Sequence, residues 1–153
     1  MVLDAGQQLD LLIRLVVALA LSAIIGIERE LQQEQAGLRT HTLVGLGAAA
    51  FTVISTFGFP DADADPTRVA AGIVTGIGFI GAGTILRNEG AVRGLSTAAS
   101  LWAVGAIGMA AGAGLYIFAL GAMILALFVL EVLERAEIAV LRNRVPPSPD
   151  RPA

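Results

Sequence analysis

Charged, hydroxyl and imidazole side chains gather at two places where one apolar stretch ends and the next begins. Mixed charges at such corners can pair with one another, hold an anion at helix N-termini, or bind a hydrated cation through carboxylates. The residue types leave these three chemistries open, beside the simpler interpretation that ion pairs fix the helix ends. The first corner holds Glu28, Arg29, Arg39, Thr40 and His41, and the second holds Arg87, Glu89, Arg93, Ser96 and Thr97.

Motifs for catalysis or metal binding do not accompany these corners. His41 is the single histidine and the chain has no cysteine, so no pair stands at zinc-ligand spacing. Three alternate aspartates in residues 61–65 lack the glycine and the glutamate that a calcium loop requires at its sixth and twelfth positions. We therefore predict that the protein is not an enzyme and has no resident cofactor. Mg²⁺ is compatible with the corner carboxylates, and the ligands of any metal are unknown.

Apolar stretches that could hold these corners at a membrane surface make up most of the chain. The 153 residues are 56% hydrophobic, with a mean hydropathy of +0.77. At 1.5 Å per residue, stretches of about 17 residues cross most of a bilayer core about 30 Å thick. We predict an all-α, polytopic transmembrane bundle of about five spans, near residues 11–27, 43–59, 69–86, 95–111 and 115–130.

The predicted bundle forms one domain over residues 1–145, and the proline-rich residues 146–153 are predicted to be a disordered tail. A net charge of −3 spread over several loops gives no basic face for nucleic acid. The N-terminal residues lack the basic start of a secretory signal, so the first span is expected to remain. The lipid bilayer is the expected surrounding.

Arginine distribution predicts the orientation, because loop arginines favour the cytoplasmic side. The first and third connections carry two arginines each and the C-terminal segment carries four, whereas the second connection has Arg68 alone at its edge. This asymmetry predicts five spans with the N-terminus outside and the C-terminus in the cytoplasm. Both polar corners then lie at the cytoplasmic face.

An internal repeat would bring the two corners together. At an offset of 57 residues, Gly26 matches Gly83, and the motif Gly-Leu-x-Thr recurs at 37–40 and 94–97. The chain then contains two parallel-repeat hairpins plus one helix. Four matches among common residues are also compatible with chance.

Glycines crowd the third apolar stretch. We predict that Gly72, Gly76 and Gly83 pack closely against a neighbouring helix, with Gly94 beyond them, since small residues let helices approach in a membrane. The alternative is that so much glycine breaks the helix and leaves backbone lining a polar cavity.

The glycine-rich stretch also carries a resemblance. Residues 76–83, Gly-Ile-Gly-Phe-Ile-Gly-Ala-Gly, followed by Arg87, Val92, Arg93-Gly-Leu and Thr97-Ala-Ala, resemble the signature of the MgtC/SapB family of bacterial inner-membrane proteins. The resemblance extends to Gly26-Ile-Glu-Arg and Ala36-Gly-Leu-Arg-Thr. It implies a multi-pass protein of the bacterial inner membrane, tied to growth at low magnesium and, in some pathogens, to survival inside macrophages.

Members of that family resemble regulators more than magnesium pumps, and one is linked to restraint of the ATP synthase. The resemblance therefore implies a non-enzymatic regulator that contacts a membrane partner, such as the ATP synthase, or a second copy of itself. The alternative is a transporter or channel for Mg²⁺ or another cation. About twenty residues follow Leu130, which is similar to the shorter SapB type, and Ser96 stands where many relatives have Asn or Thr. Both departures weaken the transfer of a virulence role.

Overall fold

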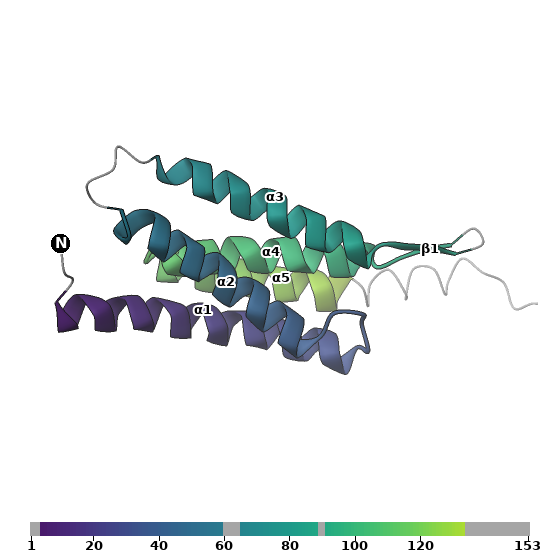
Figure 1. The fold of residues 1–153 in the computed structure, drawn as a ribbon. Helices are drawn as coiled ribbons and strands as arrows, with labels where there is room; N and C mark the ends of the chain where they lie inside the picture. Colours follow the sequence, from purple (N-terminus) through teal and green to yellow (C-terminus); the bar gives the residue numbers. More distant parts are fainter. Residues whose placement is uncertain (1–3, 60–64, 89–90, 134–153) are drawn as a thin grey trace, which may run out of the picture.

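The computed structural model describes residues 4–59, 65–88 and 91–133. The α-helices of the described residues are five in number, and they lie side by side with alternating direction (Figure 1). They are α1 (Ala5–Leu31), α2 (Leu38–Phe57), α3 (Pro66–Thr84), α4 (Leu95–Gly112) and α5 (Tyr116–Phe128), which continues into a π-helical turn, η1 (Val129–Leu133). A hairpin of β1 (Leu86–Asn88) and β2 (Ala91–Arg93) joins α3 to α4. The predicted all-α bundle is confirmed.

Length and composition make four of the described helical segments able to cross a membrane. These are α1, α2, α4 and the continuous segment Tyr116–Leu133. α3 is not among them, because glycine, threonine and Arg68 dilute its apolar residues. The prediction of five spans therefore rests, for α3, on its place in the bundle rather than on its hydropathy.

Side chains accept hydrogen bonds from backbone amides at the N-termini of α1, α2 and α3. The Asp4 carboxylate accepts a hydrogen bond from the Gln7 amide at 2.8 Å, and the Gln7 side-chain oxygen accepts one from the Asp4 amide at 3.0 Å, a capping box that starts α1. Asp65 accepts from the amide and the hydroxyl of Thr67, and these bonds hold the pKa of the Asp65 carboxyl below its ordinary value. α2 begins at Leu38, whose amide donates to the Glu30 carboxylate at 3.0 Å.

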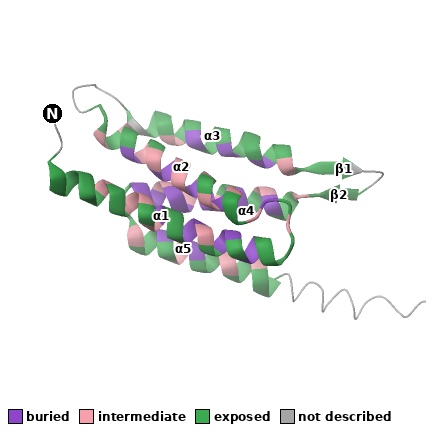
Figure 2. Ribbon diagram, turned by 60° about the horizontal axis from the view of Figure 1, so that its bottom comes forward, coloured by how far each residue is buried: buried purple, intermediate pink, exposed green. Residues whose placement is uncertain are grey.

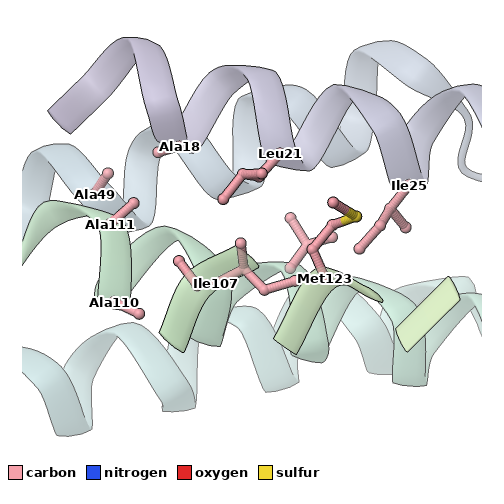
Figure 3. Packing of buried hydrophobic residues seen from close by; sticks show 10 residues of the cluster. Ala18, Leu21, Ile25, Ala49, Ile107, Ala110, Ala111 and Met123 are labelled. Carbon is pink, nitrogen blue, oxygen red and sulfur yellow. The ribbon is translucent and has the colours of Figure 1, made fainter. Parts of the chain in front are cut away.

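α4 is the centre of the bundle, since it contacts α1, α2, α3 and α5. The main core consists of alanine, leucine, isoleucine and methionine side chains from α1, α2, α4 and α5, and Figure 3 shows Leu21, Ile107 and Met123 meeting between these helices. α3 stands at the edge, and Figure 2 shows most of its length exposed. Its Ile73 and Ile77 form a smaller cluster with Ala48 of α2.

Glycines bring α2 and α4 into close contact. A Cβ at Gly108 would lie 2.3 Å from the carbonyl oxygen of Gly45, and one at Gly112 would lie 2.7 Å from that of Ala49. Real Cβ atoms do not approach backbone so closely, so these positions accept glycine alone at the present helix separation. Close helix packing through glycine therefore occurs here.

Several predicted bounds need correction. Residues 28–31 continue α1, residues 86–88 and 91–93 are paired strands, and Gly94 is the N-cap of α4. α2 begins at Leu38, five residues before the predicted residue 43. Residues 134–145 of the predicted domain and the predicted tail at 146–153 lie outside the described residues.

The proposed repeat agrees with the structure in the residues at which α2 and α4 begin. It does not agree in the backbone conformation of the glycine before each helix. α2 and α4 begin at the matching residues Leu38 and Leu95. Gly37 has φ −107°, whereas Gly94 has φ +84°, a left-handed conformation that favours glycine. A Cβ at Gly94 would also lie 2.1 Å from the carbonyl oxygen of Thr84, so the start of α4 requires glycine.

Candidate functional site

A buried ion pair occupies the last turns of α1. Arg29 is 1% exposed and Glu28 is 7% exposed. Two guanidinium nitrogens of Arg29 meet the two carboxylate oxygens of Glu28, with Nη2 2.6 Å from Oε1. A bidentate pair of this kind offsets part of the cost of removing both charges from water. The helix can therefore run through these two residues instead of ending at them.

Glu34 links this ion pair to α4. Its Oε1 lies 3.2 Å from Arg29 Nη1, and its two carboxylate oxygens accept hydrogen bonds from Ser96 at 3.1 Å and Thr97 at 2.8 Å. The connection after α1 turns back at Gln33, which has φ +57°, and this turn directs Glu34 toward the bundle. One carboxylate thus joins the α1–α2 corner to the start of α4.

His41 and Ser100 form a second buried polar contact between α2 and α4. His41 is fully buried, with Nδ1 3.0 Å from the Gly37 carbonyl oxygen and Nε2 2.9 Å from the Ser100 hydroxyl. A carbonyl only accepts, so Nδ1 carries a proton. Ser100 can donate its single proton to Thr97 O at 2.9 Å or to Nε2 of a neutral ring. The direction of this bond therefore follows the protonation of His41.

The predicted arginines at the corners divide into buried and exposed groups. Arg29 is buried, whereas Arg39 on α2 and Arg87 and Arg93 on the hairpin are exposed. No ion pair joins these three to any described residue. Thr40 is half-buried, and Glu89 lies outside the described residues. The structure thus brings together Glu28, Arg29, His41, Ser96 and Thr97.

Two members of this polar cluster were missed by the sequence argument. Ser100 lies three residues after Thr97 and four after Ser96, on the same face of α4, so helical spacing could have indicated it. Glu34 stands in a polar connection among glutamines and other acids, and no local pattern distinguishes it. We call Glu28, Arg29, Glu34, His41, Ser96, Thr97 and Ser100 the polar cluster from here on.

The predicted packing of the α3 glycines is wrong within the described chain. A Cβ at Gly72, Gly76 or Gly83 would meet nothing within 4 Å. The inner face of α3 is one position further round the helix, where Ile73 and Ile77 are buried. α3 is continuous from Pro66 to Thr84, so the alternative of a helix broken by glycine is also wrong.

The chemistry available to the polar cluster is mainly pairing. Within the described ranges, no group of three or more His, Cys, Asp and Glu residues could hold a metal ion. Both cluster carboxylates, Glu28 and Glu34, already face Arg29. A cation bound there would compete with the guanidinium, so this arrangement fixes the two corners to each other.

The sequence is similar to that of a known protein family and to several known proteins. A sequence model of the MgtC family matches residues 15–138. "Putative magnesium transporter YhiD" of Escherichia coli (strain K12) is 43% identical over 140 residues, covering 88% of this chain and 65% of that protein. "Protein MgtC" of Brucella abortus (strain 2308) is 53% identical over 98 residues, covering 64% of this chain and 40% of that protein.

"Protein MgtC" of Salmonella typhimurium (strain 14028s / SGSC 2262) is 48% identical over 116 residues, which cover 76% of this chain and 49% of that protein. The chain therefore spans between 40% and 65% of the length of these three relatives. No solved structure matches it.

Proposed function

Because this chain belongs to the MgtC family, we propose that it is a bacterial inner-membrane protein that acts in magnesium homeostasis as a non-enzymatic regulator. YhiD carries a name that refers to magnesium transport, and the regulator interpretation differs from that name. The choice between a regulator and a transporter depends on whether the interior of the described bundle is closely packed or contains a polar route. A regulator needs a surface for a partner, whereas a transporter needs a polar route through the membrane.

Close packing in the interior of the described bundle is the observation that favours a regulator. Alanine and glycine contacts hold α1, α2 and α4 close together, with Ala18, Ala49 and Ala111 fully buried at the core. The buried charged residues Glu28 and Arg29 lie at one end of the bundle and pair with each other, and the half-buried Arg14 near the other end pairs with Asp10. Pairing and close apolar packing leave little room for a hydrated cation, which supports contact rather than transport.

The hairpin offers the surface for that contact. It extends past the end of the helices (Figure 1), and Arg87 and Arg93 are exposed on it without an ion pair to any described residue. Free guanidinium groups recognise carboxylates through two parallel hydrogen bonds. We expect an acidic segment of a membrane partner at this place, and by family resemblance the ATP synthase is a candidate.

Substitution of the hairpin arginines tests the regulator. In a strain whose growth at low magnesium depends on this protein, Arg87→Gln with Arg93→Gln is expected to abolish growth while the protein stays at normal abundance. Arg68→Gln is the matched control, because Arg68 is also exposed but lies at the other end of α3. Growth of the double variant at the rate of the unsubstituted protein would contradict the proposal.

One observation favours the transporter as a second candidate. The hydroxyl oxygens of Ser22 and Thr42 are buried without a hydrogen-bond partner among the described residues. Ser22 lies nine residues before the end of α1, about 13 Å inside the bundle at 1.5 Å per residue. Uptake of Mg²⁺ into proteoliposomes that hold this protein alone decides between the two. A regulator gives no uptake above protein-free liposomes, and clear uptake would replace it with a transporter.

A further inference from the structure

An apolar groove runs between α2 and α3, away from the polar cluster. Its volume is about 630 Å³, within the range of roughly 300 to 1,000 Å³ typical of small-molecule sites. α2 and α3 lie next to each other in the bundle (Figure 1). The groove is lined by apolar residues and glycines, among them Leu43, Gly47, Phe51, Gly72, Gly76 and Ile80.

The glycines are the reason for the open space. A Cβ at Gly47, Gly72 or Gly76 would meet nothing within 4 Å, so α2 and α3 do not use them to pack against each other. The floor is made by Ala48, with Ile73 and Ile77 of the smaller core cluster. The groove therefore faces the surroundings of the bundle, which for a membrane protein are lipid.

The length and the apolar lining of the groove fit a hydrocarbon chain. From Leu43 to Phe51 the groove follows nine residues of α2, whose eight steps of 1.5 Å span about 12 Å. A hydrocarbon chain is narrower than a helix and has no polar backbone groups to satisfy in this apolar lining.

Two exposed arginines stand at opposite ends of the groove: Arg39 on α2, and Arg68 on α3, one turn before the groove residue Gly72. Arg68 follows the acidic N-cap Asp65 of α3, so we take Arg39 as the contact for an anion. Arg39 lies one turn before Leu43 on α2, is exposed, and makes no ion pair with a described residue. The first turn of α2 contains no acidic residue. A cation here complements a phosphate at the level of the lipid headgroups.

We propose that the α2–α3 groove binds an acyl chain of an anionic phospholipid whose phosphate contacts Arg39. The lipid comes from the leaflet on the side of the polar cluster, because the first turn of α2 lies at that end. The proposal depends on insertion of the bundle in a membrane and is independent of any role in magnesium homeostasis.

Lipid retention measures this site directly. The purified full chain in detergent is titrated with phosphatidylglycerol or phosphatidylcholine of identical acyl chains, and bound lipid is counted by native mass spectrometry. We expect phosphatidylglycerol to bind about fivefold more tightly, since one arginine near an anionic lipid contributes about 1 kcal/mol. Arg39→Gln should remove this preference and keep the binding of phosphatidylcholine. Arg68→Gln, at the opposite end of the groove beside Val69, should keep the preference for phosphatidylglycerol.

Filling the groove separates it from general lipid contact. Gly76→Leu places a side chain in the groove, where its Cβ would meet nothing within 4 Å, and Gly78→Leu makes the same change at an open position that does not line the groove. We expect Gly76→Leu to lose retained lipid of both kinds and Gly78→Leu to keep it, with equal unfolding midpoints. If Gly76→Leu does not fold, Gly47→Leu fills the groove from α2.

Three results would overturn the proposal. The first is equal binding of the two lipids by the unsubstituted protein. The second is equal lipid retention by the groove-filling and the Gly78→Leu variants. The third is a change from dimer to monomer on filling the groove, which would assign this surface to a second copy of the chain.

Discussion

Arg29 determines how the polar cluster is arranged, because a buried guanidinium is stable only when nearby carboxylates compensate its charge. Removing an ion pair from water costs several kcal/mol per ion, and that cost is offset by close pairing and by further hydrogen bonds. Arg29 has carboxylates on two sides, Glu28 from its own helix and Glu34 from the following connection. Its charge therefore determines where the connection lies, and through Glu34 where α4 begins.

Glu28→Gln tests this role. The change keeps the shape and removes the charge that faces Arg29 most closely. Breaking a buried pair by removing one partner costs about 3 to 5 kcal/mol, and we expect the lower end because Glu34 remains. The unfolding midpoint in detergent should fall clearly and cellular abundance should fall with it. Arg87→Gln, at an exposed position, should stay within about 0.5 kcal/mol. An unchanged midpoint for Glu28→Gln would show that the pair contributes nothing.

The sequence identified the charges of the cluster better than their partners. Glu28 and Arg29 were candidates because charges beside an apolar stretch are costly unless they have a role. Their mutual pairing was one of the alternatives left open. Glu34 could not be chosen, because its position depends on the turn at Gln33 and on the distance to α4. Arg93, like Arg29, is an arginine close to a predicted span, yet it is exposed on the hairpin.

At the scale of the elements, small residues decide which helices meet closely. α4 is buried on most sides because glycine and alanine recur along it, at Gly105, Gly108 and Gly112 among others. α3 is richer in glycine, yet most of its glycines face open space. Glycine content therefore permits close packing without fixing where it occurs. The neighbouring surface decides, and that surface is not visible in one helix's sequence.

Gly108→Ala measures the α2–α4 contact. The new Cβ would lie 2.3 Å from the Gly45 carbonyl oxygen, so the two backbones have to separate. Overpacking of this kind costs typically about 1 to 3 kcal/mol, and the unfolding midpoint in detergent should fall. Gly78→Ala makes the same change where a Cβ meets nothing within 4 Å. Equal midpoints for the two variants would contradict the close contact.

The helices themselves were predictable to within a few residues wherever apolar composition changes sharply. α4 agrees with the predicted 95–111 almost residue for residue, because Gly94 and residues 112–114 mark both ends. α1 extends beyond both predicted bounds, since polar residues at its ends have their own partners: Gln7 with Asp4, and Glu28 with Arg29. Hydropathy reports the apolar part of a helix, and hydrogen bonds determine how far it continues.

At the scale of the whole molecule, the alternating helices place both polar corners at one end of the bundle. The α1–α2 connection and the first turn of α4, which follows the hairpin, meet there through Glu34 and Thr97. The α2–α3 connection lies at the opposite end (Figure 1). This part of the sequence argument agrees with the structure. Which end faces the cytoplasm depends on insertion and not on packing, so it stays a prediction.

Arginine asymmetry predicts that the polar end faces the cytoplasm. Eight arginines lie in the segments predicted inside and Arg68 alone at an outside connection, a bias that sets orientation during insertion. Because the chain has no cysteine, single cysteines can report it. Phe59→Cys and Val92→Cys change exposed apolar residues at opposite ends and leave the charge unaltered. A membrane-impermeant maleimide should label Phe59→Cys in right-side-out vesicles and Val92→Cys in inverted vesicles. The reversed pattern would invert the topology, and labelling of both from one side would contradict the antiparallel crossing of α3.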